Sequence, residues 1–331
     1  MSVHVRAPAS TSNLGAGYDV FGLALDLMHD EVEVTLSDSS EITITVEGEY
    51  KGRVSTDPRE NSAGVAAAEL LRRAGLEGQG LSIQIRKGIP AGSGLGSSGA
   101  SSAATVVALD QLLKLNLSKE TLVEVAATGE TVAAGTPHAD NVAPSILGGF
   151  TVIYSYNPIR LLTFPPPKRV TFAVAVPQTI VKTTREARSV VPGQVTINDL
   201  RFNIGGASMV LAGLLLSNPE LIGKGMLRDA VVEPARRKLY PGYEKAREAA
   251  LALGAYGVTL SGAGPSAIAV APPKIDHRAL AEAMAEAFRA EGVPCRGYAT
   301  RPAVGAYIQL RRPSGLRTLG VKGLKYNGAR P

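Results

Sequence analysis

The 331-residue sequence predicts an α+β protein with two domains. Alternating apolar patterns typical of strands are mixed with helical patterns, and in the second half hairpin connections are mixed with crossovers. A tract of three prolines, residues 165–167, interrupts regular structure near the middle. We therefore expect one domain over residues 1–165 and another over residues 166–331. The composition, 45% hydrophobic and 19% charged, provides a sizeable core and excludes a disordered chain.

The composition also excludes several classes of function. No apolar run reaches membrane-spanning length and the first residues lack a signal pattern, so a soluble, cytoplasmic protein without a membrane partner is expected. A single cysteine, Cys295, excludes an internal disulfide and a cysteine zinc site. The net charge of +6 allows nucleic-acid binding. Aromatic residues make up only 5%, however, and an anionic small substrate explains part of the excess, so we expect no nucleic-acid partner.

In chain order, the first half predicts strands at residues 3–7, 31–36, 42–46, 81–85 and 148–155. Asn61 is expected to cap a helix that ends at residue 73, before Gly75. A second helix follows Ser97, and Ser118 caps a third that runs to about residue 134. Residues 8–19 are expected to form a polar loop. Its Asn13 and Asp19 suit recognition of a ligand, although a plain surface loop is the alternative.

Residues 92–99, the glycine loop, are the stretch around which the chain is organised. Gly92, Gly94 and Gly96 allow a tight backbone path, and the serines that follow are expected to cap the next helix. That helix is apolar nearly all round, which predicts a buried, rigid element. A glycine loop that leads into a helix N-terminus binds anions, because free N–H groups and the positive end of the helix dipole coincide there. The sequence therefore predicts a phosphate site, with a flexible linker as the alternative.

Two other glycine loops are excluded. A dinucleotide fingerprint follows a strand directly, whereas residues 87–91 intervene here, and no acidic residue ends a following strand at the right distance. A P-loop requires a Gly-Lys-Ser/Thr triplet, which the sequence lacks.

Two further polar groups in the first half are candidates for a site. Glu130 is flanked by small residues, which lets a bulky ligand approach; a solvated helix face is the alternative. His138, Asp140 and Asn141 occur within four positions of one loop. A lone histidine is more often structural, but this density of polar groups favours a site.

The second half predicts strands at residues 171–176, 256–260, 266–271 and 303–310, and helices at 197–216, 243–253 and 276–291. Residues 183–188 are expected to open a further short helix that ends by residue 192. Arg236 lies in a basic cluster. Such clusters are usually solvated, but near a site they bind anions in a bidentate way. Residues 261–265 form a second loop of small residues. The basic, glycine-rich tail, residues 311–331, has no predicted structure.

Several stretches together resemble the GHMP small-molecule kinases. Residues 90–98 resemble the phosphate loop of that family and residues 261–266 its C-terminal glycine motif. Residues 7–22, 138–144 and 233–236 resemble the branch of the family that phosphorylates homoserine. Gly99 departs from the family pattern, in which alanine is usual. The resemblance covers the chain to about residue 310.

The resemblance implies a domain like the second domain of ribosomal protein S5, followed by a ferredoxin-like domain, with the active site between them. It also implies ATP, Mg²⁺ and a homodimer. On this resemblance, the nucleotide would be bound by Asn61, Pro90, Ala91, Gly92, Ser93, Gly94, Leu95, Gly96, Ser97, Ser98, Gly99, Ala100, Ser261 and Gly262. Ser98 and Glu130 would bind Mg²⁺ through hard oxygens.

The implied reaction is ATP-dependent phosphorylation of the side-chain hydroxyl of L-homoserine. Asn13 and Asp19 suit the substrate ammonium, Asp140 and Asn141 its hydroxyl, and Glu130 and Ser98 complete the catalytic set. The substrate carboxylate would be bound by Arg188 and Arg236, with His138, and Thr184 would also contact the substrate. Phosphoryl transfer depends chiefly on positioning, so a general base is optional, with Asp140 as the candidate. The alternatives are a GHMP kinase acting on mevalonate, shikimate or pantoate, and a catalytically inactive binding protein with this fold.

Overall fold

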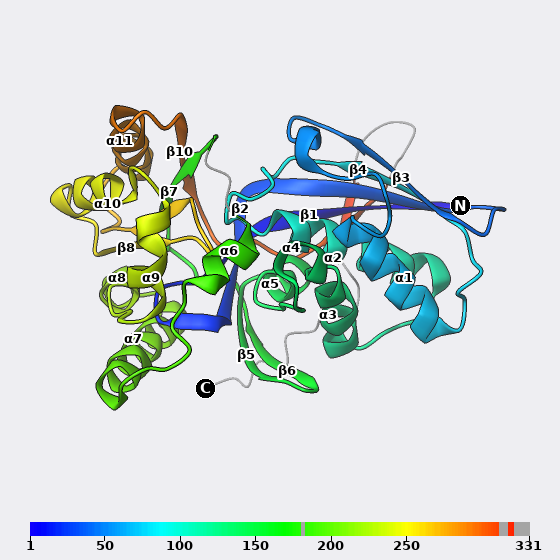
Figure 1. Ribbon diagram of the computed structural model, residues 1–331, viewed down its shortest axis with the longest axis horizontal. Helices are drawn as coiled ribbons and strands as arrows, with labels where there is room; N and C mark the ends of the chain where they lie inside the picture. The colour runs from blue at the N-terminus through cyan, green and yellow to red at the C-terminus, as the bar shows by residue number, and fades with distance from the viewer. Residues whose placement is uncertain (180–182, 311–316, 321–331) are drawn as a thin grey trace.

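The computed structural model describes residues 1–179, 183–310 and 317–320. Two sheets form its framework, one in each half of the molecule, with α6 (Thr184–Ser189) between the halves (Figure 1). The predicted mixture of strands and helices is therefore confirmed. Among the described helices, none is long and apolar enough to cross a membrane.

The first sheet has eight strands, and their order is β12-β11-β1-β2-β4-β3, with β5 and β6 joined to β2. Its strands are β1 (Ser2–Asn13), β2 (Gly17–Leu36), β3 (Ile42–Glu47), β4 (Leu81–Arg86), β5 (Phe150–Tyr156), β6 (Ile159–Phe164), β11 (Tyr307–Leu310) and β12 (Arg317–Gly320). β3 and β4 are parallel, and the other pairs are antiparallel. The chain thus returns from the second half to pair β11 with β1.

The prediction of a polar loop over residues 8–19 was wrong. β1 continues to Asn13 and β2 begins at Gly17, so only a short turn separates two long antiparallel strands. Residues 7–13 are buried despite three consecutive hydroxyl-bearing side chains, because these hydroxyls are hydrogen-bonded: those of Ser10 and Ser12 to Asn141 of the first half, and that of Thr11 to Ser261 of the second half. The sequence of this segment resembles a polar recognition loop because the buried side chains of the strand are polar.

Helices pack against one face of the first sheet. They are α1 (Ser62–Ala74), α2 (Ser97–Leu113), α3 (Lys119–Thr128), α4 (Thr131–Ala134) and α5 (Val142–Leu147) (Figure 1). The short 3-10 helix η1 (Lys51–Arg53) lies apart from them, in the segment between β3 and α1. The side chain of Asn61 caps α1 and Gly75 ends it in the left-handed conformation, both as predicted. α2 is buried on nearly all sides and packs against β1 and β2, which confirms the expected rigid central helix.

The second sheet has four antiparallel strands in the order β10-β7-β9-β8. Its strands are β7 (Phe172–Pro177), β8 (Gly257–Leu260), β9 (Ala267–Val270) and β10 (Cys295–Thr300). The helices of this half are α7 (Ile197–Leu215), α8 (Pro219–Met226), α9 (Val232–Arg236), η2 (Arg237–Leu239), α10 (Tyr243–Ala252) and α11 (His277–Ala290). Alternate residues of β7 pack into two hydrophobic clusters, one on each side of this sheet.

Other element predictions were wrong in detail. The helix expected over residues 119–134 is interrupted at Gly129 and Glu130, whose N–H groups bond to the carbonyls three residues back, of Ala126 and Ala127, so that α3 ends at Thr128 and α4 begins at Thr131. The strand expected at residues 303–310 begins only at Tyr307. Eight of the described elements had no prediction: η1, α5, β6, α8, α9, η2, β10 and β12. Of the tail, residues 311–316 and 321–331 lie outside the described part of the chain.

Candidate active site

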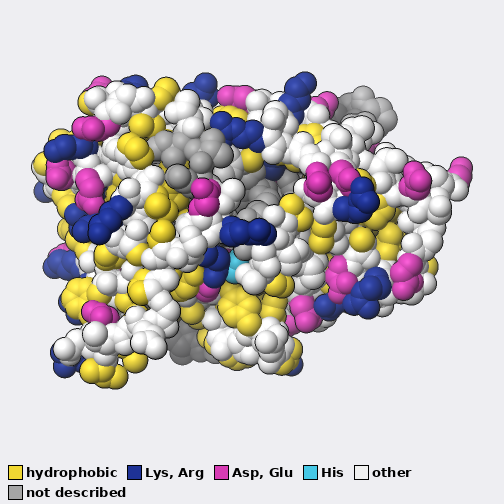
Figure 2. All heavy atoms as spheres, in the orientation of Figure 1, with side chains coloured by type: hydrophobic (Ala, Val, Ile, Leu, Met, Phe, Trp, Pro, Cys, Tyr) yellow, Lys and Arg dark blue, Asp and Glu magenta, His cyan; other side chains and the backbone are white. Residues whose placement is uncertain are grey.

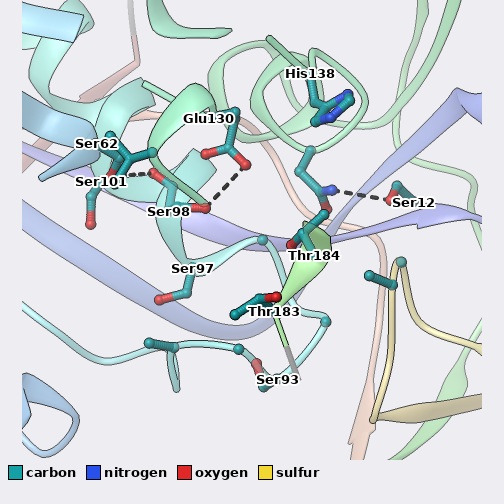
Figure 3. A pocket seen from close by; sticks show the side chains of 18 of the residues that line it. Ser12, Ser62, Ser93, Ser97, Ser98, Ser101, Glu130, His138, Thr183 and Thr184 are labelled. Atoms are coloured by element: carbon teal, nitrogen blue, oxygen red, sulfur yellow. Dashed lines mark hydrogen bonds between the residues drawn. The ribbon is translucent and has the colours of Figure 1, made fainter. Parts of the chain in front are cut away.

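A cavity of about 360 Å³ lies between the two halves of the molecule. It is lined by the end of β1, by the glycine loop, by the loop of residues 262–264 and by α6. Figure 2 shows a histidine and basic side chains at this junction, and Figure 3 shows the lining side chains from close by. Segments far apart in the sequence therefore form one pocket.

The glycine loop owes its path to backbone conformations that only glycine adopts easily. Gly92, Gly94 and Gly96 have φ of 72°, 80° and 67°. A Cβ at Gly94 would lie 2.3 Å from the Ser261 carbonyl oxygen, so the two loops pack backbone to backbone. The Ser261 hydroxyl also donates to the Gly94 carbonyl at 2.8 Å. The second glycine motif thus holds the first in place.

The N-terminus of α2 differs from the prediction. Its N-cap is Gly96, and no side chain caps the first turn. The Ser97 hydroxyl donates to the Ile89 carbonyl at 2.9 Å, and the Ser98 hydroxyl donates to Glu130 Oε2 at 3.0 Å. The prediction that these serines cap α2 was therefore wrong. The first-turn N–H groups have no side-chain cap, and they and the dipole of this 17-residue helix suit an anion.

Glu130 is buried beside the start of α2 and points toward Ser98 (Figure 3). Burial, together with the Asp140 carboxylate, raises the pKa of Glu130 to about 7. Its second oxygen, Oε1, is buried without a hydrogen-bond partner. An orphaned carboxylate oxygen beside a hydroxyl fits a hard cation such as Mg²⁺. Among the described residues, no three carboxylate, histidine or cysteine side chains form a metal cluster, so water and bound phosphate would supply the other ligands.

Lys87 and Asp30 form a buried ion pair beneath the same helix end. The Lys87 ammonium also donates to the Ser97 carbonyl at 3.0 Å and to the Ser101 hydroxyl at 2.9 Å. Asp30 accepts from the backbone N–H groups of Gly88 and Ile89. The pair therefore ties β2 and β4 to the glycine loop and to α2.

Sequence reasoning missed this pair, although the sequence carried a signal for it. Leu81, Ile83, Ile85 and Lys87 alternate on the buried side of β4 and its extension, and Asp30 alternates with Val32 and Val34 on β2. Two opposite charges in register on the buried faces of neighbouring strands indicate a pair. Arg53, Ser55, Glu60, Ser12 and Ser101 also line the pocket without having been predicted to do so.

At the other end of the pocket, Arg188 meets Asp19. The Arg188 Nη2 atom lies 2.6 Å from both carboxylate oxygens of Asp19 and 3.0 Å from His138 Nδ1. Burial and the Arg188 charge lower the pKa of His138 to about 4, so this ring is neutral near pH 7. Asn13 accepts from the Asp19 N–H at 3.1 Å and positions it. The structure thus brings together four groups that were predicted separately.

Arg236 lies beside this group and is almost fully buried. Its Nε donates to the Ala187 carbonyl at 2.9 Å, and its Nη1 to the Gly262 carbonyl at 3.4 Å. The guanidinium carbon lies 5.1 Å from the centre of the Tyr18 ring, and that of Arg188 lies 5.4 Å from it. Burial and the Arg188 charge lower the pKa of Arg236. Two cations held close together in this way favour an anion between them.

Asp140 and Asn141 lie between the two ends of the pocket. Burial and the Asp19 carboxylate raise the pKa of Asp140 to about 6, so it is mostly ionised at neutral pH. Asn141 donates to the Ser12 hydroxyl at 3.1 Å and accepts from the Ser10 hydroxyl at 3.1 Å. The orientation of Asn141 is therefore fixed by β1.

Most predicted site residues line the pocket. These are Asn13, Asp19, Asn61, Ala91, Gly92, Ser93, Gly94, Gly96, Ser97, Ser98, Glu130, His138, Asp140, Asn141, Thr184, Arg188, Arg236 and Gly262. Five do not line it: Pro90, Leu95, Gly99, Ala100 and Ser261. Leu95, Gly99 and Ala100 are buried, and the Ser261 hydroxyl is occupied by Thr11 and Gly94. These residues contact the glycine loop, or belong to it, without lining the pocket.

Comparison with known proteins gives consistent matches over the chain. Residues 61–149 match the GHMP kinases N terminal domain and residues 210–292 match the GHMP kinases C terminal domain. The curated homoserine kinase of Haloarcula marismortui is 44% identical over 304 residues, which cover 92% of this chain and 99% of the relative. That of Methanococcus vannielii is 42% identical over 307 residues, 93% of this chain and 98% of the relative.

Among solved structures, the homoserine kinase of Cytophaga hutchinsonii is similar, with a TM-score of 0.85 and 36% identity. The match covers 93% of this chain and 97% of that one. The L. major mevalonate kinase, solved with R-mevalonate, has a TM-score of 0.69 at 18% identity and covers 91% of this chain and 96% of that one. At that identity the likeness concerns the fold alone.

Proposed function

The chain belongs to the GHMP kinase family, and on this premise we propose that it transfers the γ-phosphate of ATP to the side-chain hydroxyl of L-homoserine. The product, O-phospho-L-homoserine, is an intermediate of threonine biosynthesis. The proposal is supported by relatives named homoserine kinase that match nearly the whole chain at 42–44% identity. It is also supported by the charges in the pocket, which complement an amino acid at one end and phosphates at the other.

We propose that the glycine loop and the N-terminus of α2 hold the phosphates of ATP. The first-turn N–H groups, without a side-chain cap, supply hydrogen-bond donors to phosphate oxygens. The pocket continues past Asn61, Ser55 and Val54, which gives room for the rest of the nucleotide. In this proposal the residues that do not line the pocket, such as Leu95 and Ser261, act by fixing the backbone.

Ser98 and Glu130 would hold Mg²⁺, which supplies charge neutralisation for the phosphates when bound. The orphaned Oε1 of Glu130 is the observation that favours this role. Because burial raises the pKa of Glu130 to about 7, a nearby cation would keep this carboxylate ionised at neutral pH.

The single observation that carries the choice of substrate is the ion pair between Asp19 and Arg188, with Arg236 beside it. An amino acid is a zwitterion whose ammonium and carboxylate match these charges. We propose that the substrate ammonium binds Asp19 and Asn13. Its carboxylate binds Arg188 and Arg236, with His138 and Thr184 at the edge. The Arg188 Nε atom, buried without a partner, is available for that carboxylate.

The chemistry then depends on positioning. Asn141, fixed by Ser10 and Ser12, would orient the substrate hydroxyl, and Asp140 would accept its proton. The substrate oxygen would form its bond to the γ-phosphorus as the bond from that phosphorus to the β,γ-bridging oxygen breaks, and ADP would leave with the bridging oxygen. Since the pKa of Asp140 is raised to about 6, it is ionised at pH 7 yet basic enough to take a proton.

Coupled release of ADP tests the proposal. With Mg²⁺ and ATP, we expect turnover with L-homoserine and little with mevalonate, shikimate or pantoate at the same concentration. These three alcohols lack the ammonium that would engage Asp19. Turnover with one of them in preference to homoserine would contradict the assignment, and binding without turnover of any substrate would favour the inactive binding protein.

We further propose that the protein is a cytoplasmic homodimer. A cytoplasmic location follows from the need for ATP as a substrate. A homodimer is supported by α7, on which Ile197, Leu200 and Ile204 are 76%, 45% and 57% exposed along one side. A second copy that covers this stripe would remove these side chains from water.

A further inference from the structure

A cluster of polar side chains beneath α9, outside the pocket, is centred on Glu233. Glu233 Oε1 accepts from the Tyr243 hydroxyl of α10, and Oε2 accepts from the Thr259 hydroxyl of β8. Tyr243 and Thr259 are buried. None of these residues is used in the proposed reaction. A carboxylate placed inside a domain and occupied on both oxygens is costly to desolvate, so its position calls for an explanation.

Glu233 lies one helical turn before Arg236, and both lie on α9. This helix has only five residues and cannot hold its own geometry. Its start is fixed by Asp229, whose carboxylate accepts from the N–H groups of Val231, Val232 and Glu233 at 2.8–3.0 Å. Its attachment to α10 and β8 is made by the Glu233 side chain. The direction in which Arg236 leaves the helix therefore depends on Glu233.

The same network reaches the loop that Arg236 contacts. Thr259 lies on β8, and this strand leads directly into Gly262, whose carbonyl accepts from Arg236 Nη1 and from Asn13 Nδ2. On the other side, the Tyr240 hydroxyl, just before α10, donates to the Ala263 carbonyl at 2.5 Å. Glu233 thus joins the helix that carries the guanidinium to the strand that carries its acceptor.

We propose that Glu233 is a positioning residue that holds Arg236 in the orientation needed to bind the carboxylate of the substrate. This inference rests on the proposed function, because that function gives Arg236 its ligand. It predicts an effect confined to one of the two substrates. Loss of Glu233 should disturb the amino-acid end of the pocket and leave the glycine loop intact, because hydrogen bonds of Ser93 and Ser97 to residues 87–90 hold that loop independently of Glu233.

The test compares Glu233→Ala and Glu233→Gln with the wild type under saturating Mg²⁺. We expect Glu233→Ala to raise the apparent KM for homoserine about tenfold, the scale of one lost charged contact, with the apparent KM for ATP within about twofold. Glu233→Gln should stay within about threefold, because its amide can still bond both hydroxyls. Glu244→Ala is the matched control, since Glu244 pairs with Arg237 at 3.0 Å on the surface of the same elements. It should change neither KM.

A double-mutant cycle separates positioning from a merely structural role. In an Arg236→Ala background, Glu233→Ala should raise the KM for homoserine by less than about twofold more. If the two substitutions multiply in their effect on the KM for homoserine, the inference is overturned. It is also overturned if Glu233→Ala raises the KM for homoserine and the KM for ATP equally. If Glu233→Ala does not fold, Tyr243→Phe and Thr259→Val, which each remove one donor, should give the same one-sided effect on a smaller scale.

Failure of the proposed function is seen separately, in the wild type, as the absence of turnover with homoserine. In that case a crystal structure of Glu233→Ala decides the inference. Displacement of the Arg236 guanidinium from the Gly262 carbonyl supports it, and an unchanged guanidinium overturns it.

Discussion

The ammonium of Lys87 lies beneath the glycine loop, and its burial makes it costly to remove. Lys87 and Asp30 have exposed side-chain fractions of 2% and 0%. Lys87→Met would leave the Asp30 carboxylate buried without its cation. We expect the free energy of unfolding to fall by about 3 kcal/mol, as measured by denaturant titration. The matched control is Lys224→Met, which breaks the exposed pair with Glu220 and should cost less than about 1 kcal/mol.

The double variant Lys87→Met with Asp30→Asn tests whether the loss of stability comes from the unpaired Asp30 carboxylate. Because it removes both charges, it should recover part of the stability that Lys87→Met loses. If it is less stable than Lys87→Met alone, the cost does not come from an unpaired carboxylate.

The stability of the ligand-free protein should depend on pH through Glu130. Its pKa in the folded protein, about 7, lies above the ordinary value of 4.5. The folded protein therefore keeps a proton between pH 4.5 and 7 that the unfolded chain has released, and this contribution to stability is lost as the pH rises through 7. Glu130→Gln does not titrate, so its stability relative to wild type should rise by on the order of 3 kcal/mol over this range and then level off.

Glu69→Gln serves as the control for this pH dependence. Hydrogen bonds from Arg72 lower the pKa of Glu69 to about 2, so its contribution is present above about pH 4.5 and is lost only as the pH falls through 2. The difference between Glu69→Gln and wild type should be flat from pH 5 to 8. A constant offset for Glu130→Gln over the same range would show that Glu130 is not desolvated.

Individual residues of the site were predictable where a motif carried them. Ser98, Glu130, Asp140 and Arg236 all line the pocket. Their pairings were not predictable, because they depend on distance in space. The contact between Asp19 and Arg188 joins residues 169 positions apart, and it occupies Asp19 with a cation of the protein itself in the absence of substrate. The roles of these residues in binding and catalysis stay predictions until variants are assayed.

At the scale of elements, the glycine loop distinguishes two glycines that look alike in the sequence. A Cβ at Gly94, which has φ of +80°, would lie 2.3 Å from the Ser261 carbonyl oxygen. At Gly99, in α2, it would make ordinary contacts of 3.4 Å with Asn141 and Val142. Gly94→Ala should therefore separate the two loops and abolish most activity. Gly99→Ala, which restores the usual family residue, should keep activity and raise stability by about 0.5–1 kcal/mol.

The measurement for these glycine variants is kcat/KM for ATP together with the melting temperature. A Gly94→Ala enzyme with normal ATP kinetics would show that the contact between the two loops is dispensable. Reduced stability of Gly99→Ala would show that Asn141 and Val142 cannot accept the extra methyl group.

Helices and strands were predictable where local sequence patterns determine them. They were missed where contacts with distant parts of the chain determine them. Asn61 and Gly75 bound α1 because both act within one turn of the helix. Residues 8–13 were predicted to be a loop because their polarity outweighed their place in a strand, and their hydroxyls bond to Asn141 and Ser261, which are far away in the sequence. The interruption of the helix at Gly129 and Glu130 was missed because the apolar pattern of residues 119–134 runs through it.

On the scale of the whole molecule, the two sheets act as one support for the pocket. Gly94 and Ser261, from different halves, bond to each other, and β11 returns from the second half to pair with β1. The α+β class followed from the sequence, but this return could not, because strand order is set by long-range pairing. We continue to propose a division near residues 165–167, with the segment that contains β11 rejoining the first sheet.

The association of whole molecules gives the last prediction. α7, which carries the exposed apolar stripe, lies at the lower left of Figure 1, and none of Ile197, Leu200 and Ile204 lines the pocket, so a copy bound there leaves the pocket open. Light scattering should give twice the chain mass of 34.4 kDa. Ile204→Glu places a charge within the stripe and should yield monomers, because a charge buried against an apolar partner is strongly unfavourable. Tyr154→Glu, at an equally exposed position on β5, should stay dimeric. A monomeric wild type would contradict the proposed dimer, and a dimeric Ile204→Glu would move the interface to another surface.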